Sequence, residues 1–128
     1  MDGQRERRQL PRTLLPWQIP ARVRDVHEVR LLDLNVGGTR LEHLGLLRPG
    51  AHCEVELPSV LGGLCLPARV TWSFVIGRRR GFDGHSHLLS HTGLRFAPLT
   101  TTQEAALADG LQRVTGRQRA LNSRLGSA

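Results

Sequence analysis

Short runs of alternating apolar and polar residues recur along most of the chain and predict β-strands. Apolar residues occupy every second position at residues 19–23, 51–57, 68–76 and 94–96. A period of two places one face of a strand on a hydrophobic core and the other face in water. Turns containing glycine or proline separate the runs. Strands of this length and spacing favour a compact antiparallel sandwich or barrel.

One helix is expected near the C-terminal end. Leu107, Leu111 and Val114 recur at the i, i+4, i+7 spacing of a single helix face. Thr101 followed by Glu104 matches a capping box, in which the two side chains satisfy backbone N–H groups at the start of a helix. The sequence therefore predicts a helix that begins near residue 101.

Length and composition fit one globular domain with two polar ends. The chain has 128 residues, of which 39% are hydrophobic, and this is enough to bury a core. We expect a flexible arginine-rich segment at residues 1–18, a β-domain with its helix at residues 19–115, and a polar tail at residues 116–128.

All 18 basic residues are arginines, and the formal net charge is +7. The absence of lysine and tyrosine excludes chemistry that depends on a Schiff-base lysine, a phosphate-loop lysine or a tyrosine acid. No nucleophile–base set stands out, so we expect no enzyme. The charge indicates an anionic partner, but residues 31–76 are nearly neutral, unlike a basic stripe along a DNA-reading helix.

The sequence offers no sign of export or membrane insertion. No apolar run reaches the roughly 18 residues that span a bilayer, and no hydrophobic stretch follows the first charges. Cys53 and Cys65 fit reduced thiols, although the sequence alone leaves a disulfide between them open. We expect a soluble, cytoplasmic protein that does not bind membranes.

Asp33 and Asn35 are the first candidates for a binding site. In an extended segment Leu32, Leu34 and Val36 would share the core face, which turns the carboxylate and the amide outward together. Such a pair can bind the edge of a planar heterocycle that offers N–H donors and acceptors, as guanine does. Gly37 and Gly38 would allow a turn with positive φ. The alternative is a plain Asx turn between two strands.

A second candidate is the arginine cluster near the N-terminus. Arg8 and Arg12 are four residues apart, and Arg7 precedes them. Guanidinium groups bind phosphate in a bidentate manner and stack on flat bases. A mobile segment of this kind could fold over a small dianion. The alternative is a solvated basic tail.

Taken together and in this order, the two motifs resemble the PilZ family. The resemblance rests on an R-x-x-x-R pair, a first strand punctuated by proline, and a D-x-N-x-x-G motif about twenty residues later. Residues 66–76 resemble the long strand of that family, and residues 93–100 resemble its closing strand before the C-terminal helix. The resemblance covers about residues 5–115.

The resemblance implies a six-stranded antiparallel β-barrel with a C-terminal helix that binds the bacterial second messenger cyclic di-GMP. It implies that Arg8 and Arg12 clamp the ligand, and that Arg7 accompanies two stacked ligands per chain. It also implies that Asp33 and Asn35 read a guanine edge and that Gly38 keeps the turn open. Asn35 occupies a position where serine is commoner in the family. No cofactor other than this ligand is expected.

Trp72 has two interpretations. A tryptophan near this position resembles a ligand contact in some relatives, where it stacks on guanine. The parity of the strand argues for core packing, because Trp72 falls in line with Val70 and Phe74. Two other groups favour exposed loops over sites: the histidines at 85, 87 and 91 lack a nearby cysteine, and the arginines at 78–80 fit a hairpin tip.

Three functional hypotheses follow. The first is a cyclic di-GMP receptor, in which the ligand orders the N-terminal arginine segment over the barrel and changes a surface that binds an effector protein. The second is the same barrel acting as an adaptor that needs no ligand. The third, which the charge distribution favours least, is a nucleic-acid-binding protein, whose DNA affinity would depend steeply on salt.

Overall fold

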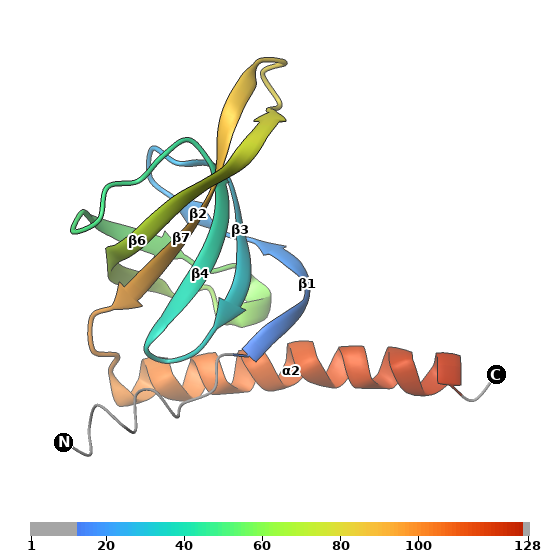
Figure 1. Ribbon diagram of the computed structural model, residues 1–128. Coiled ribbons are helices and arrows are strands. Elements are labelled where there is room, and N and C mark those ends of the chain that lie inside the picture. The colour runs from blue at the N-terminus through green and yellow to red at the C-terminus, as the bar shows by residue number, and fades with distance from the viewer. Residues whose placement is uncertain (1–12, 127–128) are drawn as a thin grey trace.

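The computed structural model describes residues 13–126, and Arg7, Arg8 and Arg12 therefore lie outside the described residues. Seven strands, a short 3-10 helix and one long α-helix make up this part of the chain (Figure 1). The elements are β1 (Thr13–Pro20), β2 (Arg22–Val23), β3 (His27–Leu34), β4 (Gly38–Leu44), β5 (His52–Glu56), η1 (Ser59–Leu61), β6 (Cys65–Arg80), β7 (Ser86–Phe96) and α2 (Thr101–Gly126).

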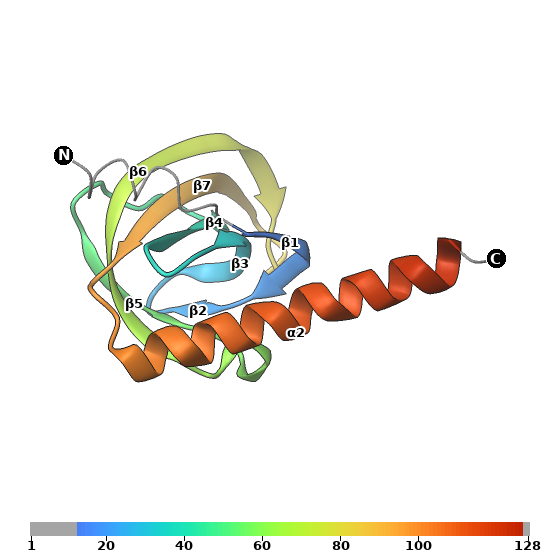
Figure 2. The same ribbon diagram turned by 90° about the horizontal axis from the view of Figure 1, so that it is seen from below.

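The strands form a nearly closed antiparallel barrel, seen end-on in Figure 2. Their order is β1-β3-β4-β7-β6-β5-β2, and every neighbouring pair is antiparallel. β1 pairs with β3 at one edge of the sheet and β2 pairs with β5 at the other. Because β1 and β2 are separated only by Ala21, this one stretch of chain joins the two edges.

The predicted count of six strands is wrong by one. The expected first strand, at residues 19–23, divides at Ala21 into β1 and β2. The Ala21 N–H still bonds to the carbonyl of Val29 in β3, at 3.2 Å, whereas Arg22 already pairs with Glu56 in β5. The strand thus changes partners at this point, which alternation along a single segment does not reveal.

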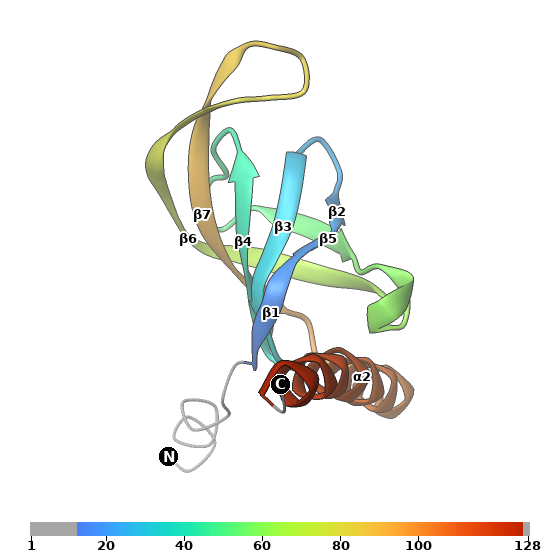
Figure 3. The same cartoon turned by 90° about the vertical axis from the view of Figure 1, so that its right-hand side faces the viewer.

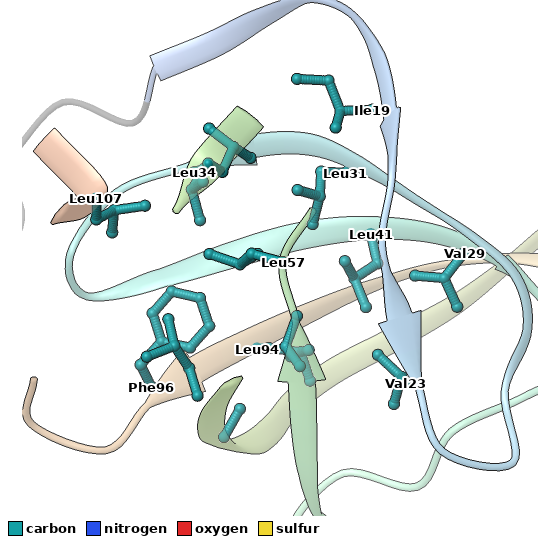
Figure 4. Close-up of a cluster of buried hydrophobic side chains, with 14 of the residues drawn as sticks. Ile19, Val23, Val29, Leu31, Leu34, Leu41, Leu57, Leu94, Phe96 and Leu107 are labelled. Atoms are coloured by element: carbon teal, nitrogen blue, oxygen red, sulfur yellow. The ribbon is translucent and has the colours of Figure 1, made fainter. Parts of the chain in front are cut away.

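The apolar alternation predicts the core correctly in most strands. Figure 4 shows part of the buried cluster, to which most strands, η1 and α2 contribute. In β6 the buried side chains alternate with exposed ones up to Val70. The fully buried large residues include Ile19, Leu31, Leu34, Leu41, Val55, Leu57, Leu61, Leu66, Val70, Leu94 and Leu107.

Helix α2 crosses one end of the barrel (Figures 1 and 2). Leu107 and Val114 are fully buried, as their spacing predicts. The capping box lies one residue earlier than predicted: Thr100 Oγ1 accepts the N–H of Gln103 at 3.1 Å, and Gln103 Oε1 accepts the N–H of Thr100 at 2.9 Å. Gly110 has a packing role, since a Cβ there would lie 2.9 Å from the Cα of Leu61.

Regular structure extends further at both ends than the sequence suggests. β1 begins at Thr13, inside the segment predicted to be flexible, and α2 continues to Gly126, through most of the predicted polar tail. The structure describes no helix long and apolar enough to pass through a bilayer. Both cysteines are free thiols.

The hairpin formed by β6 and β7 projects beyond the barrel at the end away from α2 (Figures 1 and 3). β5 pairs with β6 only as far as Arg69, and β4 pairs with β7 only as far as Leu89. From there to the turn, the two strands pair with each other, with register shifts after Val70 and after Val75. We call residues 74–89 the projecting hairpin.

Candidate ligand-binding site

A β-bulge in β3 determines which way Asp33 points. Leu31 pairs with Leu41 and Asp33 pairs with Arg40, so β3 has one extra residue, Leu32, at this point. The prediction that Leu32 shares the core face with Leu34 is therefore wrong, and Leu32 is only half-buried. Asp33 lies between the core residues Leu31 and Leu34 and pairs with Arg40 on the outer face, but its own side chain is buried.

The carboxylate of Asp33 is held by its neighbour across the strands. Asp33 Oδ1 accepts the backbone N–H of Arg40 at 3.0 Å, and Oδ2 lies 3.1 Å from Arg40 Nε. The Asp33 side chain is only 8% exposed, whereas that of Arg40 is 39% exposed. The pair therefore places a shielded anionic acceptor beside an accessible guanidinium group.

Asn35 forms the Asx turn that the sequence left open as an alternative. Its Oδ1 accepts the N–H groups of Gly37 at 2.8 Å and Gly38 at 2.9 Å. Its backbone N–H donates to the carbonyl of Gly38 at 3.0 Å. The amide oxygen of Asn35 thus fixes the shape of the loop that follows Asp33.

The reason predicted for the two glycines is wrong. Neither Gly37 nor Gly38 has a positive φ. A Cβ at Gly38 would instead overlap the carbonyl oxygen of Leu94 in β7. Glycine is required here because the backbones of β4 and β7 approach closely, which holds the Asp33 loop against β7.

Trp72 lies on the outer face of the barrel, and the parity argument that placed it in the core is wrong. Val70 pairs with Leu94 but Trp72 pairs with Gly93, so Thr71 is an extra residue that reverses the alternation. A Cβ at Gly93 would overlap the indole of Trp72, which shows that the ring covers this glycine. The Phe74 ring is 5.2 Å from the Trp72 ring.

The strand register brings Asp33 and Trp72 onto one row. Asp33 pairs with Arg40, Arg40 with Gly93, and Gly93 with Trp72, across β3, β4, β7 and β6. Directly opposed residues in antiparallel strands point to the same face. The outer face therefore presents a carboxylate, a guanidinium group and an indole side by side.

A second outer row adjoins the first. Gly38 pairs with Arg95, Arg95 with Arg69, and Arg69 with His52. Arg69 and Arg95 also line an open groove of about 650 Å³ over β5, β6 and β7. Sequence reasoning missed Arg40, Arg69 and Arg95, because only the strand register brings them next to Asp33 and Trp72.

Of the three histidines predicted to lie in an exposed loop, only His85 does so, whereas His87 and His91 lie in β7 and are half-buried. His87 Nε2 lies 2.8 Å from Asp83, and His91 Nε2 lies 3.1 Å from Glu42. Hydrogen bonds from the His85 N–H and from His87 lower the pKa of Asp83. Among residues 13–126, no three His, Cys, Asp or Glu side chains are grouped to hold a metal ion.

A buried polar chain runs inside the barrel, and the sequence analysis did not find it. His43 is fully buried, with Nδ1 at 3.1 Å from the Leu44 carbonyl and Nε2 at 2.6 Å from Thr92 Oγ1. Because a carbonyl only accepts, Nδ1 carries the proton and Nε2 accepts from Thr92. Ser73 then donates to Thr92 at 2.8 Å. Burial lowers the pKa of His43.

Comparison with known proteins supports the fold. No protein-family model matches the chain, and no curated protein matches it. Among solved structures, the chain is similar to the PilZ domain with c-di-GMP of YcgR from Escherichia coli, with a TM-score of 0.56 and 16% sequence identity. The match covers 84% of this chain and 95% of that chain. The resemblance stated from the sequence is thus confirmed as a PilZ-like fold.

Proposed function

We propose that this protein is a cyclic di-GMP receptor that binds its ligand on the outer face of β3, β4, β7 and β6. The observation that carries the proposal is the row formed by Asp33, Arg40 and Trp72 on a PilZ-like barrel. Each side chain suits one part of such a ligand. A carboxylate accepts from the guanine N–H edge, a guanidinium group binds phosphate, and an indole stacks on a base.

The N-terminal arginines complete the proposed site. Arg8 and Arg12 would grip the phosphates and stack on guanine, and Arg7 would favour a second ligand. Asn35 would hold the loop after β3 in the shape that contacts the ligand, and Gly38 would keep that loop close to β7. In this proposal the ligand draws the arginine segment onto the barrel and supplies the negative charge that holds it there.

Calorimetric titration of the full chain with cyclic di-GMP tests the proposal. We expect a dissociation constant in the micromolar range or below, with binding lost in Asp33→Asn and in Arg8→Ala. Asp109→Asn is the matched control, because it makes the same change on an exposed part of α2. Wild-type protein that releases no heat, at concentrations well above the micromolar range, would exclude the receptor function.

We further propose that the projecting hairpin is the surface for the effector protein. In the described part of the chain, the exposed large hydrophobic residues gather on it or at its base: Leu46, Phe74, Val75, Ile76 and Phe82. Phe82 at the turn is 90% exposed. Exposed apolar clusters of this kind mark interaction sites. The contact between Trp72 and Phe74 connects the row of Asp33, Arg40 and Trp72 to this surface.

The charges on the projecting hairpin indicate an acidic partner. Arg78 and Arg80 are exposed, whereas Arg79 is paired with Glu28 at 3.3 Å and with Glu42 at 3.6 Å. A second copy of this chain is disfavoured by its net charge of +7. We therefore propose a protein that presents an apolar patch flanked by carboxylates.

An adaptor that needs no ligand is the second candidate. It is favoured because the Asp33 carboxylate already pairs with Arg40, and the Asn35 side-chain oxygen already accepts hydrogen bonds from its own turn. Affinity for the effector would then be the same with and without cyclic di-GMP, and Arg8→Ala would have no effect on it. If the protein is a receptor, cyclic di-GMP should change the affinity for the effector, and Arg8→Ala should remove this effect of the ligand.

A further inference from the structure

Two arginines from neighbouring strands lie side by side next to the row that holds Asp33. Arg69 of β6 is the direct partner of Arg95 of β7, and Arg95 is the direct partner of Gly38. In an antiparallel sheet, the Cβ atoms of such partners are about 4.5–5.5 Å apart on the same face. Both side chains are exposed.

This pair is unfavourable for the protein alone. Like charges directly opposite one another destabilise a sheet. Among residues 13–126, neither Arg69 nor Arg95 forms an ion pair with a carboxylate. Arg40 and Arg79 on the same sheet do form such pairs. An anionic ligand would relieve this repulsion, and two adjacent guanidinium groups suit a phosphate group.

The groove that the two arginines line gives such a group room. Its volume is about 650 Å³, and the small residues Pro67 and Ala97 lie along it. The other charged groups of the lining are Arg24, Asp25 and Glu54, which come from β5 and the turn after β2. The two arginines lie in the row that begins at Gly38, whereas Glu54 lies opposite Pro67, two residues further along β6 from Arg69.

We propose that Arg69 and Arg95 form an anion subsite that binds a phosphodiester group of a cyclic dinucleotide. The inference rests on the proposed function and extends it along the outer face, from the Asp33 row into the groove. The phosphodiester belongs either to the ligand whose base lies at Asp33 or to a second ligand stacked on it. The chemistry of the subsite is the same in both cases.

The test is titration of the full chain carrying Arg69→Gln and Arg95→Gln with cyclic di-GMP. A dissociation constant at least tenfold higher at unchanged stoichiometry supports a contact with the first ligand. Loss of one of two bound ligands supports a contact with the second. Arg113→Gln removes one charge from α2, outside the residues that line the groove, and should bind as the wild type does.

A stability measurement separates a binding role from a structural one. Because the double variant removes a repulsion, its Tm without ligand should equal or exceed that of the wild type. A variant that binds cyclic di-GMP with wild-type affinity and stoichiometry overturns the subsite and leaves the proposed function intact. A variant with lower Tm and unchanged binding also overturns it.

Failure of the proposed function gives a different result, in which the wild type itself releases no heat with cyclic di-GMP. Inorganic pyrophosphate then serves as the probe, with its effect on Tm as the readout. Stabilisation of the wild type and of Arg113→Gln, but not of the double variant, supports an anion subsite at Arg69 and Arg95. Equal stabilisation of all three proteins overturns it.

Discussion

The β6–β7 pair has two parts that differ in whether their apolar side chains are buried. In the barrel part, at residues 65–70 and 92–96, inward side chains are buried, and the outward-facing Arg69 and Arg95 lie beside the row that contains Asp33 and Trp72. In the projecting hairpin, at residues 74–89, apolar side chains are exposed and the strands have no other strand beside them for most of their length. The same two strands thus supply a core wall at one end and the proposed effector-binding surface at the other.

The difference separates apolar residues that stabilise the fold from apolar residues that the proposed function assigns to effector binding. Val70 and Leu94 are 1% exposed and belong to the core cluster. Phe74 and Phe82 are 63% and 90% exposed. Burial on this scale contributes a few kcal/mol for a large side chain, whereas an exposed side chain contributes little to folding. Substitutions in the two parts should therefore separate stability from binding.

The largest expected effect is that of truncating a core residue in the barrel part. Leu94→Ala should lower the free energy of unfolding by about 3 kcal/mol, because it leaves a cavity in a packed core. Phe82→Ala in the projecting hairpin should change it by less than about 0.5 kcal/mol. Urea denaturation followed by circular dichroism measures both. Similar losses in the two variants would remove the distinction between the two parts.

Two glycines, one in the barrel and one in the projecting hairpin, test whether the backbone is also packed more tightly in the barrel. Gly38→Ala should cost about 2 kcal/mol, since its Cβ would overlap the carbonyl oxygen of Leu94 and force β4 away from β7. Gly77→Ala should be nearly neutral, because a Cβ there meets no atom within 4 Å. The same denaturation measurement applies, and a neutral Gly38→Ala would show that β4 and β7 separate easily.

Between about pH 5 and 7, stability should depend on pH through His43 in the barrel. Burial lowers the pKa of His43 below its ordinary value of 6.5, so the unfolded chain binds the proton first as the pH falls. The contribution of neutral His43 is complete above about pH 6.5 and is lost progressively below it. His43→Asn should flatten the dependence of stability on pH between about 5 and 7, as measured by urea denaturation at several pH values.

The fold could be predicted from the sequence where burial alone decides the structure. Alternation identifies the inner faces of most strands, and the i, i+4, i+7 spacing identifies the buried face of α2. The predicted helix cap is one residue too late, because Thr100 with Gln103 and Thr101 with Glu104 both match the capping pattern. Local sequence does not distinguish the two.

The site was harder to predict because it depends on register. Leu32 and Thr71 are bulge residues, and each reverses the alternation on its own strand. The reversal at Thr71 moved Trp72 from the predicted core face to the outer face. The closeness of Arg69 and Arg95 is likewise a property of two strands read together, so neither residue stood out in a single segment.

The smallest expected effect concerns the residue that holds the projecting hairpin. Glu28 adopts a positive φ of 52°, and its carboxylate accepts the Phe82 N–H at 2.8 Å and pairs with Arg79. Glu28→Gly should relieve roughly 1 kcal/mol of backbone strain but remove both of these interactions, so the net change in stability should be small. Because the hydrogen bond to Phe82 is local, amide exchange at that residue should become faster.

Asp25→Gly is the matched control for this last prediction. Asp25 also has a positive φ, of 64°, but is exposed in the turn after β2. This variant should gain stability without changing exchange at Phe82. If Glu28→Gly gains as much stability as Asp25→Gly and leaves exchange at Phe82 unchanged, the carboxylate does not restrain the projecting hairpin. A loosened hairpin should also bind the effector less tightly, because its apolar side chains would have to be ordered on binding.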